Sequence, residues 1–186
     1  IVCATYLCAA AAAGGEVRLT GVDYRAVSTV ALALAESGCE VRSEADAVSL
    51  RSAGALRSVR PVRTAPYPGF PTDAQPVLMA ALLKSEGCTV FVENIFENRY
   101  RHVDELSRMG AEIRVAGRVA VVNGVRALHG AAVKCTDLRG GAALVIAGLS
   151  AEGTTRVTEL THIDRGYDAI ERDLAALGAR IRRETT

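Results

Sequence analysis

Apolar and polar positions along the chain follow the same order three times. In each cycle an apolar, helix-like run ends at a glycine and leads into a short strand-like stretch, and a second, amphipathic run ends at another glycine. The two glycines of a cycle are 23, 23 and 25 residues apart: Gly15 and Gly38, Gly87 and Gly110, Gly153 and Gly178. A glycine directly after such a run is typical of a helix end. The pattern predicts a threefold internal repeat, with a longer period than most solenoids have.

Two kinds of helix are expected in each unit. The first helices are apolar on all sides, which favours burial: Val2–Ala13, Ala74–Lys84 and Leu138–Ala151. The second helices alternate charged with apolar residues and should lie outside: Ala26–Glu36, Val103–Met109 and Tyr167–Leu177. A strand should follow each helix, and hairpin strands are expected at Val48–Leu50 and Val119–Val122. The predicted fold class is α/β, with units of helix, strand, helix, strand, strand, and with buried helices surrounded by sheets and outer helices.

The composition fits one globular domain of residues 1–186. The chain is 49% hydrophobic and 23% charged, which is enough to bury a sizeable core. Its formal net charge of +1 provides no general field for nucleic acid or an anionic membrane, so a bound anion must meet locally placed arginines. The alanine-rich start has 13 residues before Gly14, too few to span a bilayer, and is expected to be a buried helix.

Cysteine and histidine indicate neither a metal site nor a nucleophile. The five cysteines form no CxxC pair or Cys/His cluster, and they are expected to be reduced, in a cytoplasmic protein. His102, His129 and His162 are dispersed. GxGxxG and P-loop patterns are absent, and Gly140-Gly141 is interpreted as a place where another element packs closely.

All five prolines lie in or beside the segment Arg63–Asp73. Because proline fixes φ and lacks an N–H donor, this segment is expected to join neither a sheet nor a helix and to form a stiff, extended connector. It ends where the second buried helix begins, and Thr72 or Asp73 is expected to cap that helix. Asp73 is thereby placed at a rigid corner of the fold.

Arginines recur at equivalent positions before helices. Arg99 and Arg165 each lie 12 residues after the glycine that ends the first helix of their unit. They can converge on one anion, since guanidinium forks bind carboxylate or phosphate. They can equally be solvated, or paired separately with Glu97 and Asp164. The residue types leave both interpretations open.

Carboxylates also recur before the buried helices. Thr136-Asp137 precedes the third buried helix as Thr72-Asp73 precedes the second, and Arg139 follows. Helix capping explains both pairs. A second interpretation is that the helices begin at a common edge, where their N-termini would attract an anionic ligand.

Four segments resemble one family of enzymes. They are Arg63–Asp73, Ile95-Phe96-Glu97-Asn98-Arg99, Thr136-Asp137-Leu138-Arg139 and His162-Ile163-Asp164-Arg165-Gly166-Tyr167. In this order they are similar to segments of the bacterial UDP-N-acetylglucosamine 1-carboxyvinyltransferases, the enolpyruvyl transferases that open peptidoglycan synthesis. The sister family of 3-phosphoshikimate 1-carboxyvinyltransferases looks less similar in these segments.

The resemblance implies one lobe of a two-lobed, inside-out α/β barrel in which each lobe has three repeats. The chain resembles the C-terminal lobe, with units of about 1–52, 68–123 and 133–184. The family's Lys-Asn pair and its cysteine-bearing loop have no counterpart here, so the chain is expected to be inactive without the N-terminal lobe. The implied substrates are phosphoenolpyruvate and UDP-N-acetylglucosamine, with no cofactor.

The resemblance also implies roles for single residues. Asp73 would contact the attacking sugar hydroxyl as the base, and Asp137 with Arg139 would support proton transfer and lobe closure. Ile95, through its backbone, and Phe96 would contact the UDP-sugar. Arg99 and Arg165 would bind phosphoenolpyruvate. The alternatives are a stand-alone module that binds a sugar nucleotide or another anion, a lobe of a 3-phosphoshikimate transferase, and a structural fragment with solvated arginines.

Overall fold

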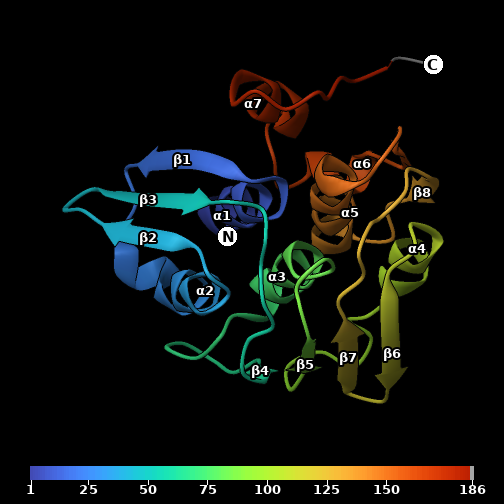
Figure 1. Ribbon diagram of the computed structural model, residues 1–186, viewed down its shortest axis with the longest axis horizontal. Coiled ribbons are helices and arrows are strands. Elements are labelled where there is room, and N and C mark those ends of the chain that lie inside the picture. The colour runs from blue at the N-terminus through green and yellow to red at the C-terminus, as the bar shows by residue number, and fades with distance from the viewer. Residues whose placement is uncertain (185–186) are drawn as a thin grey trace.

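Three apolar helices form the centre of the molecule. The structure is a computed structural model that describes residues 1–184. Helices α1 (Val2–Ala13), α3 (Gln75–Ala81) and α5 (Leu138–Ser150) pack against one another, and sheets and further helices lie around them (Figure 1). Each of the three contributes one fully buried leucine to a continuous core, namely Leu7, Leu78 and Leu144. The prediction of three buried helices is confirmed.

The first unit places a three-stranded sheet and an outer helix beside α1. β1 (Gly15–Thr20) and β2 (Glu40–Ser43) both pair antiparallel with β3 (Ala47–Ser52), so that β3 lies in the middle. α2 (Tyr24–Glu36) buries its apolar face and leaves its polar face outside, as predicted. Gly14 ends α1 with a φ of 77°, a left-handed conformation that glycine adopts without strain.

The second unit has a strand before its buried helix. Its elements are β4 (Val62–Arg63), the 3₁₀ turn η1 (Thr72–Ala74), α3, β5 (Cys88–Val92), α4 (Val103–Arg108), β6 (Glu112–Ala116) and β7 (Val119–Asn123). β4 pairs parallel with β5, and β7 and β6 follow in antiparallel order. The expectation that Arg63–Asp73 joins neither a sheet nor a helix is therefore wrong at Arg63, which lies in β4, and at Thr72 and Asp73, which lie in η1. Within this segment the first proline is Pro66, so Thr64 keeps its N–H, which donates to the Val92 carbonyl at 3.0 Å.

The third unit is shorter than predicted. β8 (Ala132–Lys134) and β9 (Arg156–Thr158) pair in parallel on either side of α5 in the sequence, and α6 (Thr161–Asp164) and α7 (Ile170–Ala176) follow. The strand expected after Gly178 does not form, because residues 179–184 have no regular secondary structure. In the other two units this strand pairs with the hairpin strand, and the described part of the third unit has no such partner. The predicted strand order thus holds in two units only.

The buried helices begin at a common edge of the molecule. Arg139, at the start of α5, contacts Asp73, just before α3. At the opposite ends, Lys84 donates to the carbonyl of Ser150 at 3.1 Å, so α3 and α5 run parallel. Thr5, in the first turn of α1, is joined to the same edge through Tyr167. The interpretation of a shared edge of helix N-termini is confirmed.

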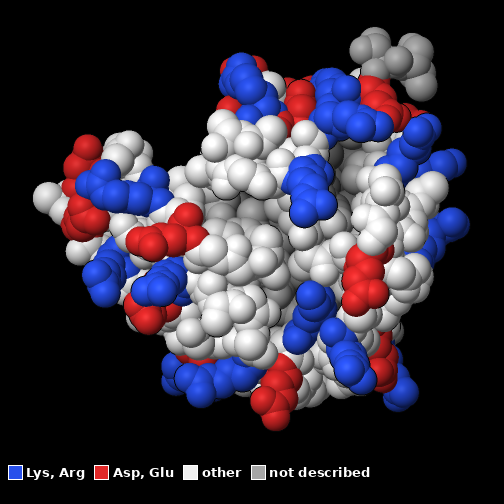
Figure 2. Space-filling model, turned by 45° about the horizontal axis from the view of Figure 1, so that its top comes forward, with Lys and Arg blue, Asp and Glu red and all other residues white. Residues whose placement is uncertain are grey.

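Charges of both signs are interspersed on the surface. On the face shown in Figure 2, uncharged residues fill the middle, some Lys and Arg side chains lie beside them, and other charged residues of both signs lie nearer the margin. Among the described residues, no helix combines the length and the apolar character that a membrane crossing requires.

Candidate functional site

Asp73 lies between two arginines at the edge where α3 and α5 begin. Its Oδ1 is 2.6 Å from Arg99 Nη2, and its Oδ2 is 3.2 Å from Arg139 Nη2. The two arginine side chains are only 12% and 16% exposed, whereas that of Asp73 is 39% exposed. The carboxylate therefore faces solvent, with a guanidinium behind each oxygen.

Asp73 is not a helix cap. Neither η1 nor α3 has a side-chain cap, and the hydroxyl of Thr72 donates to Glu93 at 3.0 Å instead. The capping expectation for Thr72 and Asp73 is wrong because both side chains have partners outside the helix, and because the 3₁₀ turn leads directly into α3. The loop before them is closed by a bridge between Thr64 and Phe70.

Burial raises the pKa of Asp73, but the hydrogen bond from Arg99 and the charges of Arg139 and Arg99 outweigh it, so the pKa lies below its ordinary value. Asp73 is therefore ionised at neutral pH. In this arrangement it is a weak proton acceptor, because two cations stabilise its charged form.

Arg99 is held by the loop that carries Asp73. Its Nη2 donates to the Thr72 carbonyl at 2.9 Å as well as to Asp73, and its guanidinium carbon lies 5.2 Å from the centre of the Phe96 ring. The expected alternative, in which Arg99 pairs with Glu97, is not what the structure has.

Arg139 is fixed by Asp137 and Tyr167. Asp137 caps α5, since its Oδ1 accepts from the N–H groups of Arg139 at 3.0 Å and Gly140 at 2.8 Å. The Arg139 guanidinium donates to the Tyr167 hydroxyl at 3.3 Å, which is also hydrogen-bonded to Thr5 at 2.7 Å. Capping by Asp137 is thus confirmed, and it aims Arg139 at Asp73.

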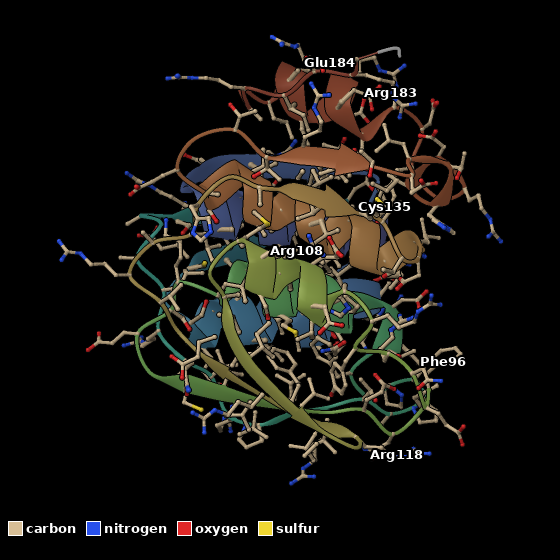
Figure 3. The ribbon with its side chains drawn as sticks, turned by 90° about the vertical axis from the view of Figure 1, so that its right-hand side faces the viewer. Phe96, Arg108, Arg118, Cys135, Arg183 and Glu184 are labelled. Carbon is tan, nitrogen blue, oxygen red and sulfur yellow. The ribbon has the colours of Figure 1, made fainter. Side chains whose placement is uncertain are left out.

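A pocket of about 570 Å³ lies beside this cluster. It is lined by Ile95, Phe96, Glu97, Asn98, Arg99, Arg101 and Asp137. The side chains of Ile95 and Phe96 are large, apolar and partly exposed, at 41% and 51%. Figure 3 shows Phe96 at the outer edge of the molecule, on the loop that follows β5. Ile95 and Phe96 form the apolar rim of this pocket, and four of the other lining residues are charged.

Arg165 is the predicted site residue that the structure does not place in this cluster. It is exposed and follows α6, next to Gly166, where an added Cβ would lie 2.8 Å from Leu138 Cδ2 at the start of α5. Within residues 1–184 its side chain has no ion pair, and its neighbour Asp164 pairs with Arg183 at 2.6 Å. Arg165 thus lies near the shared edge but does not meet Arg99 there, and its expected pairing with Asp164 is wrong.

Glu93 is a polar residue of this region that sequence reasoning missed. It is 1% exposed and accepts hydrogen bonds from the hydroxyls of Thr64 and Thr72. The available signal was its position, since a glutamate directly after the apolar strand Cys88–Val92 must be buried or mark a strand end. Within the described residues no three His, Cys, Asp or Glu side chains are grouped to hold a metal ion.

This arrangement favours binding of a small anionic ligand. Two largely buried guanidiniums and one accessible carboxylate supply cations and a proton acceptor within one site. The apolar rim can cover a ligand and reduce its contact with water.

Comparisons with known proteins place the chain among enolpyruvyl transferases. The family model described as EPSP synthase (3-phosphoshikimate 1-carboxyvinyltransferase) matches residues 1–174. The chain is 50% identical over 183 residues to the UDP-N-acetylglucosamine 1-carboxyvinyltransferase of Gluconacetobacter diazotrophicus, covering 98% of this chain and 43% of that protein. A protein of the same name from Desulfofundulus thermocisternus is 52% identical over 177 residues, with 95% of this chain and 72% of that protein covered.

Solved structures agree with this assignment. The enolpyruvyl transferase NikO from Streptomyces tendae superposes with a TM-score of 0.86 at 30% identity, covering 97% of this chain and 43% of that one. The EPSP synthase from Acinetobacter baumannii matches with a TM-score of 0.65 at 20% identity, over 89% of this chain and 42% of that one, a likeness that concerns the fold alone. The chain thus spans less than half the length of these two solved proteins.

Proposed function

The chain belongs to the EPSP synthase family of enolpyruvyl transferases, and on this premise we propose that it is part of a UDP-N-acetylglucosamine 1-carboxyvinyltransferase. Such an enzyme moves the enolpyruvyl group of phosphoenolpyruvate onto the 3-hydroxyl of UDP-N-acetylglucosamine and releases phosphate, as the first committed step of peptidoglycan synthesis. Sequence identity supports UDP-N-acetylglucosamine over 3-phosphoshikimate as the acceptor. The chain is 50% identical to a relative named UDP-N-acetylglucosamine 1-carboxyvinyltransferase and 20% identical to a solved EPSP synthase.

In this proposal residues 1–186 form the C-terminal lobe of an inside-out α/β barrel in the cytoplasm. Its repeat units are about 1–52, 68–123 and 133–184, and the N-terminal lobe of the same enzyme closes over the edge where the buried helices begin. Support comes from the central position of α1, α3 and α5, with sheets outside them, and from the 43% of a relative that the chain covers. Lobe closure would exclude water from the site.

The observation that carries the proposal is the Asp73 carboxylate held between Arg99 and Arg139. Phosphoenolpyruvate brings a carboxylate and a phosphate, which compete with Asp73 for the same guanidiniums. Each guanidinium that turns to the substrate leaves Asp73 with a higher pKa, so that it can accept the proton of the sugar hydroxyl. Substrate binding and activation of the base are coupled in this way.

The proposal gives a role to each of the other predicted residues. The N–H of Ile95 donates to Glu93, and the Ile95 carbonyl would contact the UDP-sugar together with Phe96, which lines the pocket. Asp137 and Arg139 would support protonation of the enol carbon and lobe closure. Arg165 is exposed, and would reach phosphoenolpyruvate only once the second lobe has closed.

The test is phosphate release by the full-length protein that contains this chain. Phosphoenolpyruvate is supplied with UDP-N-acetylglucosamine in one assay and with 3-phosphoshikimate in another, and the 186-residue chain is assayed beside the full-length protein. We expect turnover by the full-length protein with the UDP-sugar only, and none by the chain alone. Turnover only with 3-phosphoshikimate would overturn the substrate assignment. Binding of the UDP-sugar without phosphate release by either protein would favour a binding module.

A further inference from the structure

Glu93 is a buried carboxylate that the reaction outlined above does not use. It follows β5 directly, and 1% of its surface is exposed. A carboxylate in the protein interior is costly unless hydrogen bonds satisfy both of its oxygens. The contacts of Glu93 should therefore explain why a carboxylate is buried at this point.

Four donors from three parts of the chain surround Glu93. Its Oε1 accepts from the Thr64 hydroxyl at 2.9 Å and from the backbone N–H groups of Ile95 at 2.8 Å and Phe96 at 3.0 Å. Its Oε2 accepts from the Thr72 hydroxyl at 3.0 Å. The carboxylate thus ties both ends of the proline-rich loop to the loop that follows β5.

One of these ties leads directly to the charged cluster. Thr72 precedes Asp73, and its carbonyl accepts a hydrogen bond from Arg99 Nη2 at 2.9 Å. The same nitrogen lies 2.6 Å from Asp73 Oδ1. Glu93 is therefore connected through a single residue to both members of the ion pair, while its other oxygen fixes the backbone of Ile95 and Phe96.

We propose that Glu93 is a positioning residue that sets the distance between the Asp73–Arg99 pair and the apolar rim of the pocket. It touches no reacting atom, and it acts through Thr72 on one side and through the Ile95 and Phe96 amides on the other. Its effect on catalysis rests on the proposed function, whereas its effect on the pKa of Asp73 does not.

Three variants separate positioning from general stability. Glu93→Ala removes both acceptor oxygens. Glu93→Gln keeps the size and one oxygen, and its amide can donate to Thr72, whose hydroxyl can accept as well as donate. Thr89→Val is the control. Thr89 is also fully buried on β5, and its hydroxyl accepts from the Val59 N–H at 3.2 Å. The variant therefore loses one buried hydrogen bond at the other end of the strand.

The first measurement is the titration of the Asp73 carboxyl by NMR in the 186-residue chain. In Glu93→Ala a loosened Thr72 lets Arg99 move, so the pKa of Asp73 should rise by about 0.5 or more. Glu93→Gln should shift it less, and Thr89→Val should not shift it. If Glu93→Ala does not fold, Thr72→Val removes only the tie to Oε2 and should raise the same pKa. An Asp73 pKa that is unchanged in the folded Glu93 or Thr72 variant would overturn the proposal.

The second measurement is phosphate release by the full-length enzyme. A displacement of about 1 Å in the site can lower the rate about 100-fold, so we expect kcat/KM of Glu93→Ala to fall about 10- to 100-fold. Glu93→Gln should largely restore it, and Thr89→Val should leave it unchanged. Full activity of Glu93→Ala would overturn the catalytic part. If the wild-type protein itself releases no phosphate, the proposed function fails, and the Asp73 titration still decides the role of Glu93.

Discussion

Asp73 illustrates what can and cannot be inferred for a single residue. Its place at the end of a proline-rich segment and before a buried helix was predictable from the sequence. Its partners were not, because Arg99 and Arg139 are 26 and 66 residues away and no local rule connects them. The local sequence therefore predicted that Asp73 caps a helix, whereas in the tertiary structure Asp73 pairs with two arginines.

Replacement of Asp73 tests this ion pair through stability. Because the folded-state pKa of Asp73 is lowered, its contribution is present above the unfolded-state pKa of about 3.9 and is lost as the pH falls through the folded-state value. Asp73→Asn should lower the free energy of unfolding at neutral pH by at most about 1 kcal/mol, since the carboxylate is partly exposed and screened by solvent.

The measurement is urea unfolding of the chain at neutral and at acidic pH. The difference between Asp73→Asn and wild type should shrink as the carboxylate of the wild type becomes protonated. Asp168→Asn is the matched control, because Asp168 also pairs with an arginine but is 97% exposed, and it should have no measurable effect. An equal loss in both variants would contradict a specific role for the Asp73 pair.

At the scale of elements, the sequence predicted helices better than strands. The all-round apolar runs identified α1 and α5 almost to the residue, because full burial and helical length leave a clear pattern. The missing strand after Gly178 shows the limit. A strand forms only beside another strand with which it can pair, and the sequence of residues 179–182 does not show whether such a partner lies next to it.

The start of α5 gives a prediction in which stability and activity separate. Asp137→Ala removes the cap of α5 and should cost about 1 kcal/mol of unfolding free energy, while Asp137→Ser keeps a capping oxygen and should cost less. If the proposed function holds, both variants of the full-length protein should lose activity, because both lack the carboxylate. Urea unfolding and phosphate release measure the two effects. Retained activity in Asp137→Ser would show that Asp137 serves only as the cap of α5 and has no part in the reaction.

Gly141 tests the interpretation of the glycine pair in the same helix. A Cβ at this position would lie 2.7 Å from Ile163 Cγ1 and 2.9 Å from Cys135 Sγ, which confirms close packing. Alanine favours a helix over glycine by about 1 kcal/mol, but overpacking in a core costs about 1–3 kcal/mol. Gly141→Ala should therefore lower or leave unchanged the unfolding free energy measured in urea. A clear gain in stability would show that α6 can move away from the added methyl group without a loss of free energy.

At the scale of the whole molecule, we expect acid stability to depend on His102, which the sequence shows only as one of three dispersed histidines. His102 is completely buried, and within the described residues neither ring nitrogen has a partner. Its Cβ lies close to the first turn of α5, where an added Cβ on Gly140 would be 2.9 Å away. Burial lowers the pKa of His102 from 6.5 to about 4, and the Arg99 charge adds to this effect, while the charge of Asp137 and the backbone of Arg99 oppose it.

A histidine that stays neutral in the folded state makes the protein less stable in acid. Between pH 6.5 and about 4 the unfolded chain binds a proton that the folded chain does not. The unfolding free energy should therefore decrease as the pH is lowered, by up to about 1.4 kcal/mol per pH unit. His102→Phe removes this titration and keeps an aromatic ring at the same buried position. Its unfolding free energy should change less than that of wild type between about pH 7 and pH 4.5. His129→Gln, at an exposed histidine, should follow the wild type, and a pH dependence in His102→Phe equal to that of wild type would assign the acid sensitivity to other groups.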